Sequence, residues 1–580
     1  MRIAQHLSEV AEQAIEAALG ETAPAALRPA KDPRHGDYQL SGVMPLAKRL
    51  GRPPRELAVP VAEHLGQHEA IATAEVAGPG FVNLRLDPTW VGAAITGMLS
   101  DRSRDGVPSV ARAKKVVVDF SSPNIAKQMH VGHLRSTIIG DAISRLLSFV
   151  GHEVVRDNHL GDWGTQFGLL IVGMRAFGDP EALERDAIQE LDRVYKLAAA
   201  RAKQDEVFAE SARAELAKLQ QGDQDNRGLW QQFVAATRVT LERAYERMEV
   251  HFDTWLGESA YQDRLAGVVQ TLLERGVARE DQGAICVFFE GDKDLGKHKT
   301  PFIVRKKDGA FLYSTTDIAT VQYRKEVFGA DAAVYVVDQR QALHFKQLFA
   351  VVKLLGIEME LAHVGFGTVL GADGKPLKSR DGDNIKLSDL LDEAEQRASE
   401  RIRQAAAERG EEMNLTPERL AELAAVVGIG AVKYVDLSQN RTSDYKFDWD
   451  KMISFKGNAG PYLQYAHARV HAVFRKAGVD MDKLSSTSSM QLEHPEEVSL
   501  AKLLLRFADA VHDAATSYQP HLVCDHLYAL ARQFSVFYEQ CPVLKAQGET
   551  RATRLALCAL SARQLARGLR LLGIAAPTRM

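Results

Sequence analysis

The sequence predicts an α/β protein whose central feature is a doubly wound parallel sheet. Three short runs rich in Val carry this prediction, at Val116–Val118, Val154–Val155 and Val334–Val337. Each run is followed by a polar loop and then by apolar residues at helical spacing. Strands that alternate with helices in this way favour a parallel sheet with helices on both faces, which is the Rossmann-like architecture. Nucleotides bind to such sheets beyond the carboxyl ends of the strands.

The composition of the 580-residue chain is that of a globular protein, and its length suggests about four domains. Hydrophobic residues make up 46% and charged residues 26%. No apolar run approaches the roughly 18–20 residues that a membrane span needs, and the N-terminal segment lacks the apolar core of a signal peptide. We therefore expect no membrane partner. The four cysteines show no CxxC spacing, which is typical of free thiols in a reducing compartment and predicts a cytoplasmic protein. The net charge of −4 neither indicates nor excludes RNA binding.

The stretch that follows the first strand gives the clearest functional signal. A turn-rich loop leads into a helix predicted over 131–149. His130, Gly132 and His133 lie at the start of this helix, where free backbone N–H groups and the helix dipole favour an anion. Two imidazoles add donors for phosphate oxygens, and the glycine lets a flat base approach the backbone. The two histidines could instead be metal ligands or ordinary packed side chains. No Cys or third His stands nearby at zinc spacing, so we expect no metal here.

The residues around these histidines resemble a known signature. Residues 121–137, SSPNIAKQMHVGHLRST, are similar to the first signature of class I aminoacyl-tRNA synthetases in the form found in arginyl-tRNA synthetases. The resemblance implies that His130 and His133 bind the phosphates of ATP and stabilise the transition state of adenylation. It also implies that Asn124 contacts the amino-acid substrate. GDWGTQFG, at 161–168, is close to the same family's pattern.

A second signature-like segment lies at 371–380 and reads GADGKPLKSR. It is not a P-loop, because Pro376 stands where a Ser or Thr is required. The segment resembles instead the mobile loop that class I synthetases write as KMSKS. It departs from the usual motif, so either Lys375 or Lys378 could meet the ATP phosphates. The resemblance implies that Lys127, in the first signature, supplies the positive charge that this segment lacks, from the other side of the ATP phosphates.

Four residues besides Asn124 are candidates for binding the amino acid. A guanidinium is planar, always charged and rich in donors, so its pocket needs carboxylates and an aromatic wall. Tyr313 and Asp317 are four residues apart and share one face of a predicted helix, while Glu258 stands in a turn. An acidic residue near a helix start is by itself typical of an N-cap. The resemblance favours the pocket, and it implies that Gln341 touches the head group of the amino acid.

Residues 1–108 are predicted to form a separate α+β domain. HGDYQ at 35–39 and AGPGFVN at 77–83 resemble the N-terminal domain of arginyl-tRNA synthetases, which grips the elbow of tRNA. The resemblance implies that Phe81 and Asn83 meet a base of the D-loop, where an aromatic ring can stack and an amide can read an edge.

The chain beyond residue 456 is predicted to be helical, and its last stretch resembles the anticodon-binding bundle of the family. Three of its side chains recur at i, i+3 and i+7 on one helix face, which suits them to stack on bases and bind phosphate. With two residues that the resemblance adds, the candidates for tRNA binding here are Tyr462, Tyr465, Arg469, Tyr538 and Met580. Six arginines and no acidic residue stand between 551 and 580, and they are either a solvated face or an RNA footprint.

These observations predict three domains, namely 1–108, a catalytic domain over 109–455 with a charged helical insertion at 180–245, and 456–580. The resemblance covers nearly the whole chain. It implies an arginine–tRNA ligase that forms arginyl-adenylate from arginine and ATP, with Mg²⁺ accompanying the ATP, and charges tRNA(Arg). It also implies that activation needs tRNA, and we expect a monomer. One alternative is another class I specificity or HxGH nucleotidyltransferase, which would lack the acidic pocket. The other is an inactive synthetase-like RNA-binding protein, against which the intact signature histidines and lysine argue.

Overall fold

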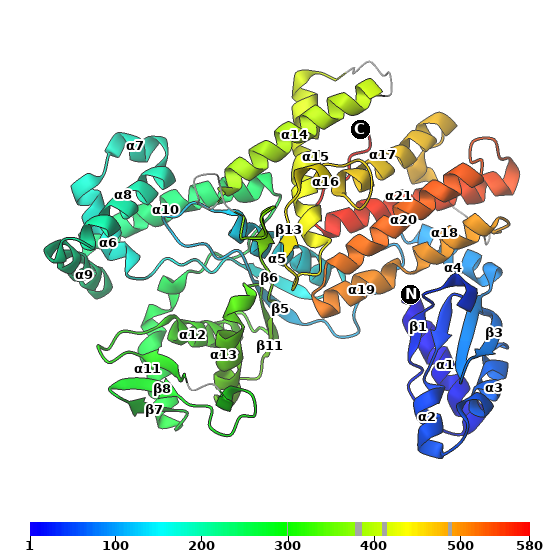
Figure 1. The fold of residues 1–580 in the computed structure, drawn as a ribbon, viewed down its shortest axis with the longest axis horizontal. Helices are drawn as coiled ribbons and strands as arrows, with labels where there is room; N and C mark the ends of the chain where they lie inside the picture. Colours follow the sequence, from blue (N-terminus) through cyan, green and yellow to red (C-terminus); the bar gives the residue numbers. More distant parts are fainter. Residues whose placement is uncertain (298–299, 378–384, 409–414, 485–489) are drawn as a thin grey trace. The chain divides into compact units, whose positions relative to one another are not determined.

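The computed structural model describes residues 1–297, 300–377, 385–408, 415–484 and 490–580. It divides the chain into two compact units (Figure 1), one made of Met1–Val110 with Ser454–Met580 and the other of Ala111–Ile453. The predicted N-terminal and C-terminal domains thus lie in one unit. No described helix combines the length and the apolar character that crossing a membrane requires.

The second unit is built on a four-stranded parallel sheet, as predicted. Its strands are β5 (Lys115–Asp119), β6 (Glu153–Asp157), β10 (Ala332–Tyr335) and β11 (Glu360–His363). Their order is β11-β10-β5-β6, and Val117 of β5 pairs with Ala333 on one side and Val155 on the other. The chain passes from β5 to one edge and later from β10 to the other, so the order reverses between β5 and β10. Ligands of doubly wound sheets bind at this switch point, beyond the carboxyl ends of the strands.

Helices flank this sheet in the order that the sequence predicts. Helix α5 runs Val131–Phe149 and is buried along most of its length, because it packs on the sheet. Helix α12 (Tyr313–Glu326) begins at Tyr313, so Tyr313 and Asp317 share a face. The other helices of this unit are α6 (Gln166–Phe177), α7 (Pro180–Arg185), α8 (Ala187–Ala202), α9 (Glu206–Gln221), α10 (Gln224–Arg247), α11 (Gln262–Glu274), α13 (Ala342–Leu354), α14 (Leu387–Glu408), α15 (Pro417–Leu437) and α16 (Trp449–Met452). Helices α7 to α10 form the predicted insertion (Figure 1).

Two smaller strand pairings complete the unit. They involve β7 (Ala278–Asp281), β8 (Ala284–Val287) and β9 (Phe302–Arg305), which form an antiparallel sheet, and β12 (Val369–Leu370) with β13 (Tyr445–Lys446). Strand β7 shows no apolar pattern in the sequence, because three of its four residues are polar and exposed.

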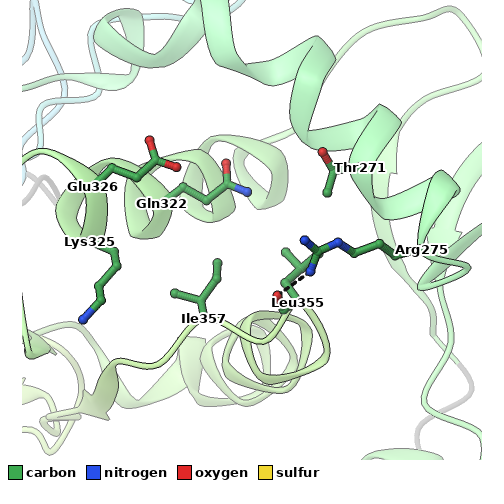
Figure 2. Close-up of a pocket in the computed structure, with 7 residues that line it drawn as sticks. All are labelled: Thr271, Arg275, Gln322, Lys325, Glu326, Leu355 and Ile357. Carbon is green, nitrogen blue, oxygen red and sulfur yellow. Dashed lines mark hydrogen bonds between the residues drawn. The ribbon is translucent and has the colours of Figure 1, made fainter.

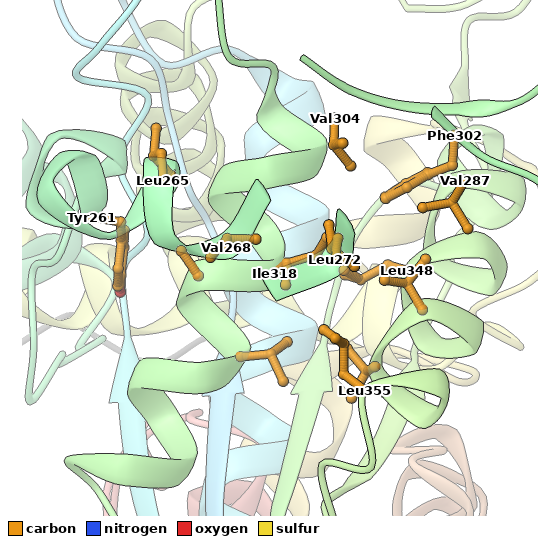
Figure 3. Packing of buried hydrophobic residues seen from close by; sticks show 14 of the residues in the cluster. Tyr261, Leu265, Val268, Leu272, Val287, Phe302, Val304, Ile318, Leu348 and Leu355 are labelled. Atoms are coloured by element: carbon orange, nitrogen blue, oxygen red, sulfur yellow. The ribbon is translucent and has the colours of Figure 1, made fainter. Parts of the chain in front are cut away.

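One apolar core joins the small sheet to the parallel sheet. Figure 3 shows side chains of α11, α12, α13, β8 and β9 packed together, and the same cluster includes Val117 and Ala333 of the parallel sheet. The hydroxyls of Ser314 and Thr315, in the first turn of α12, donate to backbone carbonyls of β9. This packing fixes the N-terminal end of α12, where Tyr313 and Asp317 lie.

The N-terminal part of the first unit is α+β, as predicted. Its antiparallel sheet has the order β1-β2-β4-β3. The strands are β1 (Leu27–Pro29), β2 (Tyr38–Leu40), β3 (Ile71–Ala77) and β4 (Phe81–Leu86), and the helices are α1 (Ile3–Leu19), α2 (Val43–Leu50), α3 (Pro54–Leu65) and α4 (Pro88–Ser100). The Gly-Pro-Gly segment is the turn between β3 and β4. Gly80 has φ of 151°, and a Cβ there would lie 2.7 Å from Cβ of Pro54, so the turn requires glycine.

The C-terminal part of this unit is helical, with α17 (Gly460–Ala477), α18 (Pro495–Leu505), α19 (Phe507–Ser517), α20 (His521–Gln540) and α21 (Gly548–Leu571). Its arginine-rich last helix serves packing. The fully buried Asp105 accepts from Arg563 at 2.7 Å and from Arg567 at 2.5 Å, and Arg554 pairs with Glu497 at 2.7 Å. These three arginines therefore have acidic partners within this unit and are not a solvated face. Charge patterns in a sequence do not reveal which arginines have buried acidic partners.

Candidate active site

Two histidines close the first turn of α5. The backbone N–H of Gly132 donates to Nδ1 of His130 at 3.0 Å, and the N–H of His130 donates to Nδ1 of His133 at 3.2 Å. The centroids of the two rings lie 4.0 Å apart. The side chains thus satisfy N–H groups that a helix start leaves free.

These contacts fix the protonation of both rings. A backbone N–H can only donate, so each Nδ1 is the unprotonated nitrogen and each Nε2 of the neutral ring carries the proton. Burial, together with the charges of His130 and Lys127, lowers the pKa of His133 to about 3. Burial and Lys127 also lower the pKa of His130. At neutral pH both imidazoles are uncharged, and each offers an Nε2–H donor, which suits a phosphate oxygen.

Gly132 and Lys127 complete this end of the site. A Cβ at Gly132 would lie 2.8 Å from Cε1 of His130, so any larger residue would displace the ring from its cap. This is a second reason for glycine beside the approach of a flat base. Lys127 is exposed, and its ammonium lies 5.5 Å from the ring centroid of Tyr195 on α8.

The loop that carries Asn124 lies against the segment after β6. The backbones of Asn124 and Gly161 pair as in a parallel sheet, and a Cβ on Gly161 would lie 2.1 Å from Oδ1 of Asn124. A Cβ on Gly257 would lie 2.3 Å from the carboxyl carbon of Asp162. The two glycines therefore allow three segments to approach one another, and they bring Asn124 and Glu258 to the same pair of residues, 161–162.

Three carboxylates gather beyond these glycines. Burial, together with the charges of Asp317 and Asp162, raises the pKa of Glu258 to about 8. Burial also raises the pKa of Asp162, although its carboxylate accepts from the N–H and the hydroxyl of Ser259 at 2.8 and 2.6 Å. A buried carboxyl whose pKa is raised by neighbouring carboxylates is a group that a cation would stabilise.

The helices α12 and α13 supply the other wall. Oδ2 of Asp317 lies 2.6 Å from Nε2 of His344. The ring of Tyr313 lies 4.9 Å from the His344 ring, and 62% of Tyr313 is exposed. The structure thus brings Tyr313, Asp317 and Glu258 together as predicted. Gln341 is exposed in a short 3-10 turn, Gln339–Gln341, just before α13, and among the described residues it forms no side-chain hydrogen bond to this cluster.

The second signature region lies close to the first. Two backbone hydrogen bonds, of 3.1 and 2.9 Å, pair residues 129–131 with residues 385–387. Lys375 lies in an exposed turn that follows β12. Lys378 lies outside the described residues. The pairing ties the end of this segment to the start of α5, where the histidines lie.

A buried ion cluster that the sequence analysis missed lies at the ends of β5 and β6. Nη2 of Arg324 on α12 donates to Asp119 at 2.6 Å and to Asp157 at 2.7 Å, and all three side chains are buried. Asp119, Asp157 and His159 have the residue types and spacing of a metal site. The guanidinium already neutralises both carboxylates, so we assign the cluster to Arg324. The sequence feature that could have revealed this cluster is an acidic residue at the end of each of two successive strands, Asp119 and Asp157.

A separate cavity of about 180 Å³ lies toward the other end of α12 (Figure 2). It is lined by Thr271, Arg275, Gln322, Lys325, Glu326, Leu355 and Ile357. Its charged groups are engaged, since Arg275 donates to the carbonyl of Leu355 at 2.7 Å and Arg264 donates to Glu326 at 2.6 Å. It lies beside the segment that leads into β11, away from the carboxyl ends of the strands, and we assign it no part in the site.

Two faces of the first unit carry the residues predicted to bind RNA. Phe81 and Asn83 project from one face of β4, and Val82 and Leu84 are buried on the other. The amide of Gln39 on β2 donates to Oδ1 of Asn83 at 2.9 Å. An aromatic ring and an oriented amide therefore share an accessible sheet face.

The second face lies on α17 and α20. The guanidinium of Arg469 lies 5.2 Å from the ring centroid of Tyr538, and the Tyr462 ring lies 5.9 Å from that of Tyr528. Tyr465 is half-buried on the same helix, with its ring 6.3 Å from that of Phe455. Tyr528 was not found from the sequence, because α20 shows no comparable stripe of aromatic residues.

The C-terminal tail packs along α17. Gln464, His467 and Arg475 contact the carbonyls of residues 575, 577 and 578 at 2.9, 2.9 and 3.1 Å. Met580 therefore ends a segment that is held on the helix of the aromatic face.

Three stretches of the chain match known families. Residues 94–449 match the family described as tRNA synthetases class I (R), catalytic domain. Residues 463–580 match the DALR anticodon binding domain, and residues 2–86 match the arginyl tRNA synthetase N terminal domain.

Whole proteins match as well. The arginine–tRNA ligases of Pseudomonas aeruginosa PAO1 and Erwinia tasmaniensis are 45% and 46% identical, over 99% and 94% of both chains. The crystal structure of arginyl-tRNA synthetase from Plasmodium falciparum matches with a TM-score of 0.85 and 26% identity, over 100% of this chain and 99% of that one. The Thermus thermophilus arginyl-tRNA synthetase matches with a TM-score of 0.81 and 25% identity over 100% of both. The chain therefore belongs to the arginyl-tRNA synthetases, within the class I tRNA synthetases.

Proposed function

We propose that this chain, an arginine–tRNA ligase, forms arginyl-adenylate at the carboxyl edge of its parallel sheet and charges tRNA(Arg). The carboxylate of arginine attacks the α-phosphorus of ATP, pyrophosphate leaves, and the 3′ end of the tRNA then displaces AMP. The observation that supports this best is one loop that ends at two neutral donor histidines and, at Asn124, lies against residues 161–162, which in turn lie against Gly257 beside the buried Glu258.

The two histidines act on ATP. Their Nε2–H groups donate to phosphate oxygens and stabilise the charge that develops on the transferring phosphoryl group. Both Nδ1 atoms are held by backbone N–H groups, so the donors are aligned before ATP arrives. Gly132 admits the base, and Lys127 with Lys375 or Lys378 neutralises the departing pyrophosphate.

Mg²⁺ fits this site as a companion of ATP. In the described residues, the one group with the composition of a metal site is Asp119, Asp157 and His159, whose carboxylates are held by Arg324. Phosphate oxygens of ATP would then hold the ion, and a bound ion would supply charge neutralisation there. The steps assigned to the protein remain those of its own donors and lysines.

The carboxylate cluster selects arginine. Glu258 and Asp317 accept from the guanidinium, and the exposed ring of Tyr313 forms one wall. Asn124 and Gln341 hold the head group, so that the carboxylate of arginine faces the ATP phosphates. Positioning of the two reactants is the main contribution of the protein to the rate.

The three predicted domains, 1–108, 109–455 and 456–580, have separate roles in catalysis and tRNA binding. The sheet face of Phe81 and Asn83 contacts the tRNA elbow, while Tyr462, Tyr465, Arg469, Tyr538 and Met580 contact the anticodon region. The half-exposed aromatic rings and the adjacent guanidinium support this, because bases stack on such surfaces.

Activation needs bound tRNA, and the enzyme is a cytoplasmic monomer. The departure of KPLKSR from the KMSKS pattern supports the need for tRNA, since the site is incomplete in its lysines. The four cysteines are free and buried, which supports a reducing compartment. Catalytic and tRNA-binding surfaces occur in one chain, which supports a monomer.

The test is a charging assay with tRNA and a panel of amino acids. Arginine alone should be attached to the tRNA. Attachment of another amino acid would favour another class I specificity. Tight tRNA binding without any charging would favour an RNA-binding protein that has lost the reaction.

A further inference from the structure

The helical insertion, α7 to α10, reaches the loop between β5 and α5. The hydroxyl of Tyr245 on α10 lies 2.7 Å from Oγ of Ser121, and the N–H of Ala126 donates to Oγ1 of Thr237, also on α10, at 3.1 Å. All four residues are buried. The charged composition of this insertion is typical of a solvated face, but two of its hydroxyls contact the loop that leads to the histidines.

These contacts lie at residues of the loop whose backbone conformation is unfavourable. Ser121, Ser122 and Ala126 have φ of 71°, 48° and 62°, a left-handed conformation that residues other than glycine adopt at a cost. Such residues persist when their surroundings hold them. Tyr245 and Thr237 contact the first and the last of the three.

Tyr245 also reaches the remaining strained residue and the first turn of α5. Its hydroxyl accepts from the amide of the buried Asn158 at 3.2 Å, and Oδ1 of Asn158 accepts from the N–H of Ser122 at 3.1 Å. Oγ of Ser121 lies 2.8 Å from the hydroxyl of Thr137, which lies 2.8 Å from the carbonyl of His133. A chain of hydrogen bonds thus runs from the insertion to a signature histidine.

We propose that α10 positions the activation site, with Tyr245 and Thr237 holding the strained loop so that Asn124 and the two histidines face their substrates together. Both are positioning residues, since neither contacts ATP or arginine. Because the inference depends on the proposed roles of Asn124 and the histidines, its test must separate the two.

The test uses substitutions that remove one hydroxyl. Tyr245→Phe and Thr237→Val should each lower kcat of arginine-dependent ATP–pyrophosphate exchange, measured with saturating tRNA, by about 10–100-fold, the scale of a misplacement near 1 Å. The KM for tRNA should not change. Thr237→Ser keeps the acceptor and should retain most of the activity.

The matched control is Thr320→Val on α12. Thr320 is as buried as Thr237, and its hydroxyl likewise bonds the carbonyl four residues before it, at 2.8 Å, but it contacts no part of the loop. It should lose thermal stability comparably while keeping kcat. An equal fall in kcat for Thr320→Val, or wild-type kcat for folded Tyr245→Phe and Thr237→Val, would overturn the inference.

His133→Ala, assayed in parallel, separates this inference from the proposed function. If His133→Ala is slow and the α10 variants are normal, only the positioning role fails. If His133→Ala keeps full activity, the proposed role of the histidines fails, and the positioning role fails with it.

Discussion

The affinity for arginine should rise steeply between pH 6 and pH 8, because Glu258 must ionise to accept the guanidinium. Its pKa is raised from the ordinary value of 4.5 to about 8 by burial and by the charges of Asp317 and Asp162. In the free protein at pH 7, this carboxyl is therefore mostly protonated. A bound guanidinium favours the carboxylate, so binding arginine releases a proton.

The magnitude follows from the ionised fraction. With a pKa of about 8, about 1% of Glu258 is ionised at pH 6 and about 50% at pH 8, and the apparent affinity scales with the competent fraction. Arginine should bind about 50-fold more tightly at pH 8, which corresponds to about 2.3 kcal/mol. The stability of the arginine-free protein changes with pH in the opposite direction. The raised pKa makes the free energy of unfolding fall as the pH rises from about 4.5 to about 8, because the folded state must give up a proton that the unfolded state has already lost.

Calorimetric titrations of arginine at pH 6, 7 and 8 measure the affinity, and repeating one pH in buffers of different ionisation enthalpy measures the proton released. Glu258→Gln is the control, since an amide does not titrate and should flatten the pH dependence. An affinity that does not change between pH 6 and pH 8 would refute the reasoning. The same slope in Glu258→Gln would assign the titration to another group.

Four further outcomes test the site. His133→Ala should slow adenylate formation by about 10²–10³ in single-turnover assays and leave arginine affinity nearly unchanged, since one aligned donor is lost. Asp317→Asn should weaken arginine binding by about 2–5 kcal/mol in calorimetry, and wild-type affinity would remove this residue from the pocket. ATP–pyrophosphate exchange should be slight without tRNA and large with it, and replacing both Tyr465 and Arg469 by Ala should raise the tRNA concentration required; vigorous exchange without tRNA contradicts this ordering. Arg324→Met leaves two buried carboxylates facing each other and should lower the free energy of unfolding by about 3–5 kcal/mol, measured by denaturant titration.

The fold could be predicted where the sequence carries a periodic apolar pattern. Strand β5 and helix α5 were found because a β-branched run and a helical repeat stand next to each other, separated by turn residues. The parallel direction of the strands followed from the alternation of strands and helices, whereas their order is known only from the structure. Strand β7 was missed because its side chains are mostly exposed, so burial leaves no pattern in them.

The site could be predicted only in its residue types, because its geometry depends on contacts between distant segments. Asp317 and Glu258 were found as carboxylates suited to a guanidinium, but nothing in their spacing shows that the charge of Asp317 raises the pKa of Glu258. Tyr245 lies 124 positions from Ser121 along the chain, and no local pattern marks its hydroxyl as a partner of that loop.

The histidines were the strongest prediction because their contacts are local in the sequence. His130, Gly132 and His133 interact within one helical turn, so their capping contacts are encoded in adjacent residues. Contacts between neighbouring residues can be predicted from the sequence. The unfavourable backbone conformation of the preceding loop, and the packing of α10 that holds it, can be seen only in the structure. If that packing sets the rate, variants of Thr237 should change activation while every residue of the signature itself stays intact.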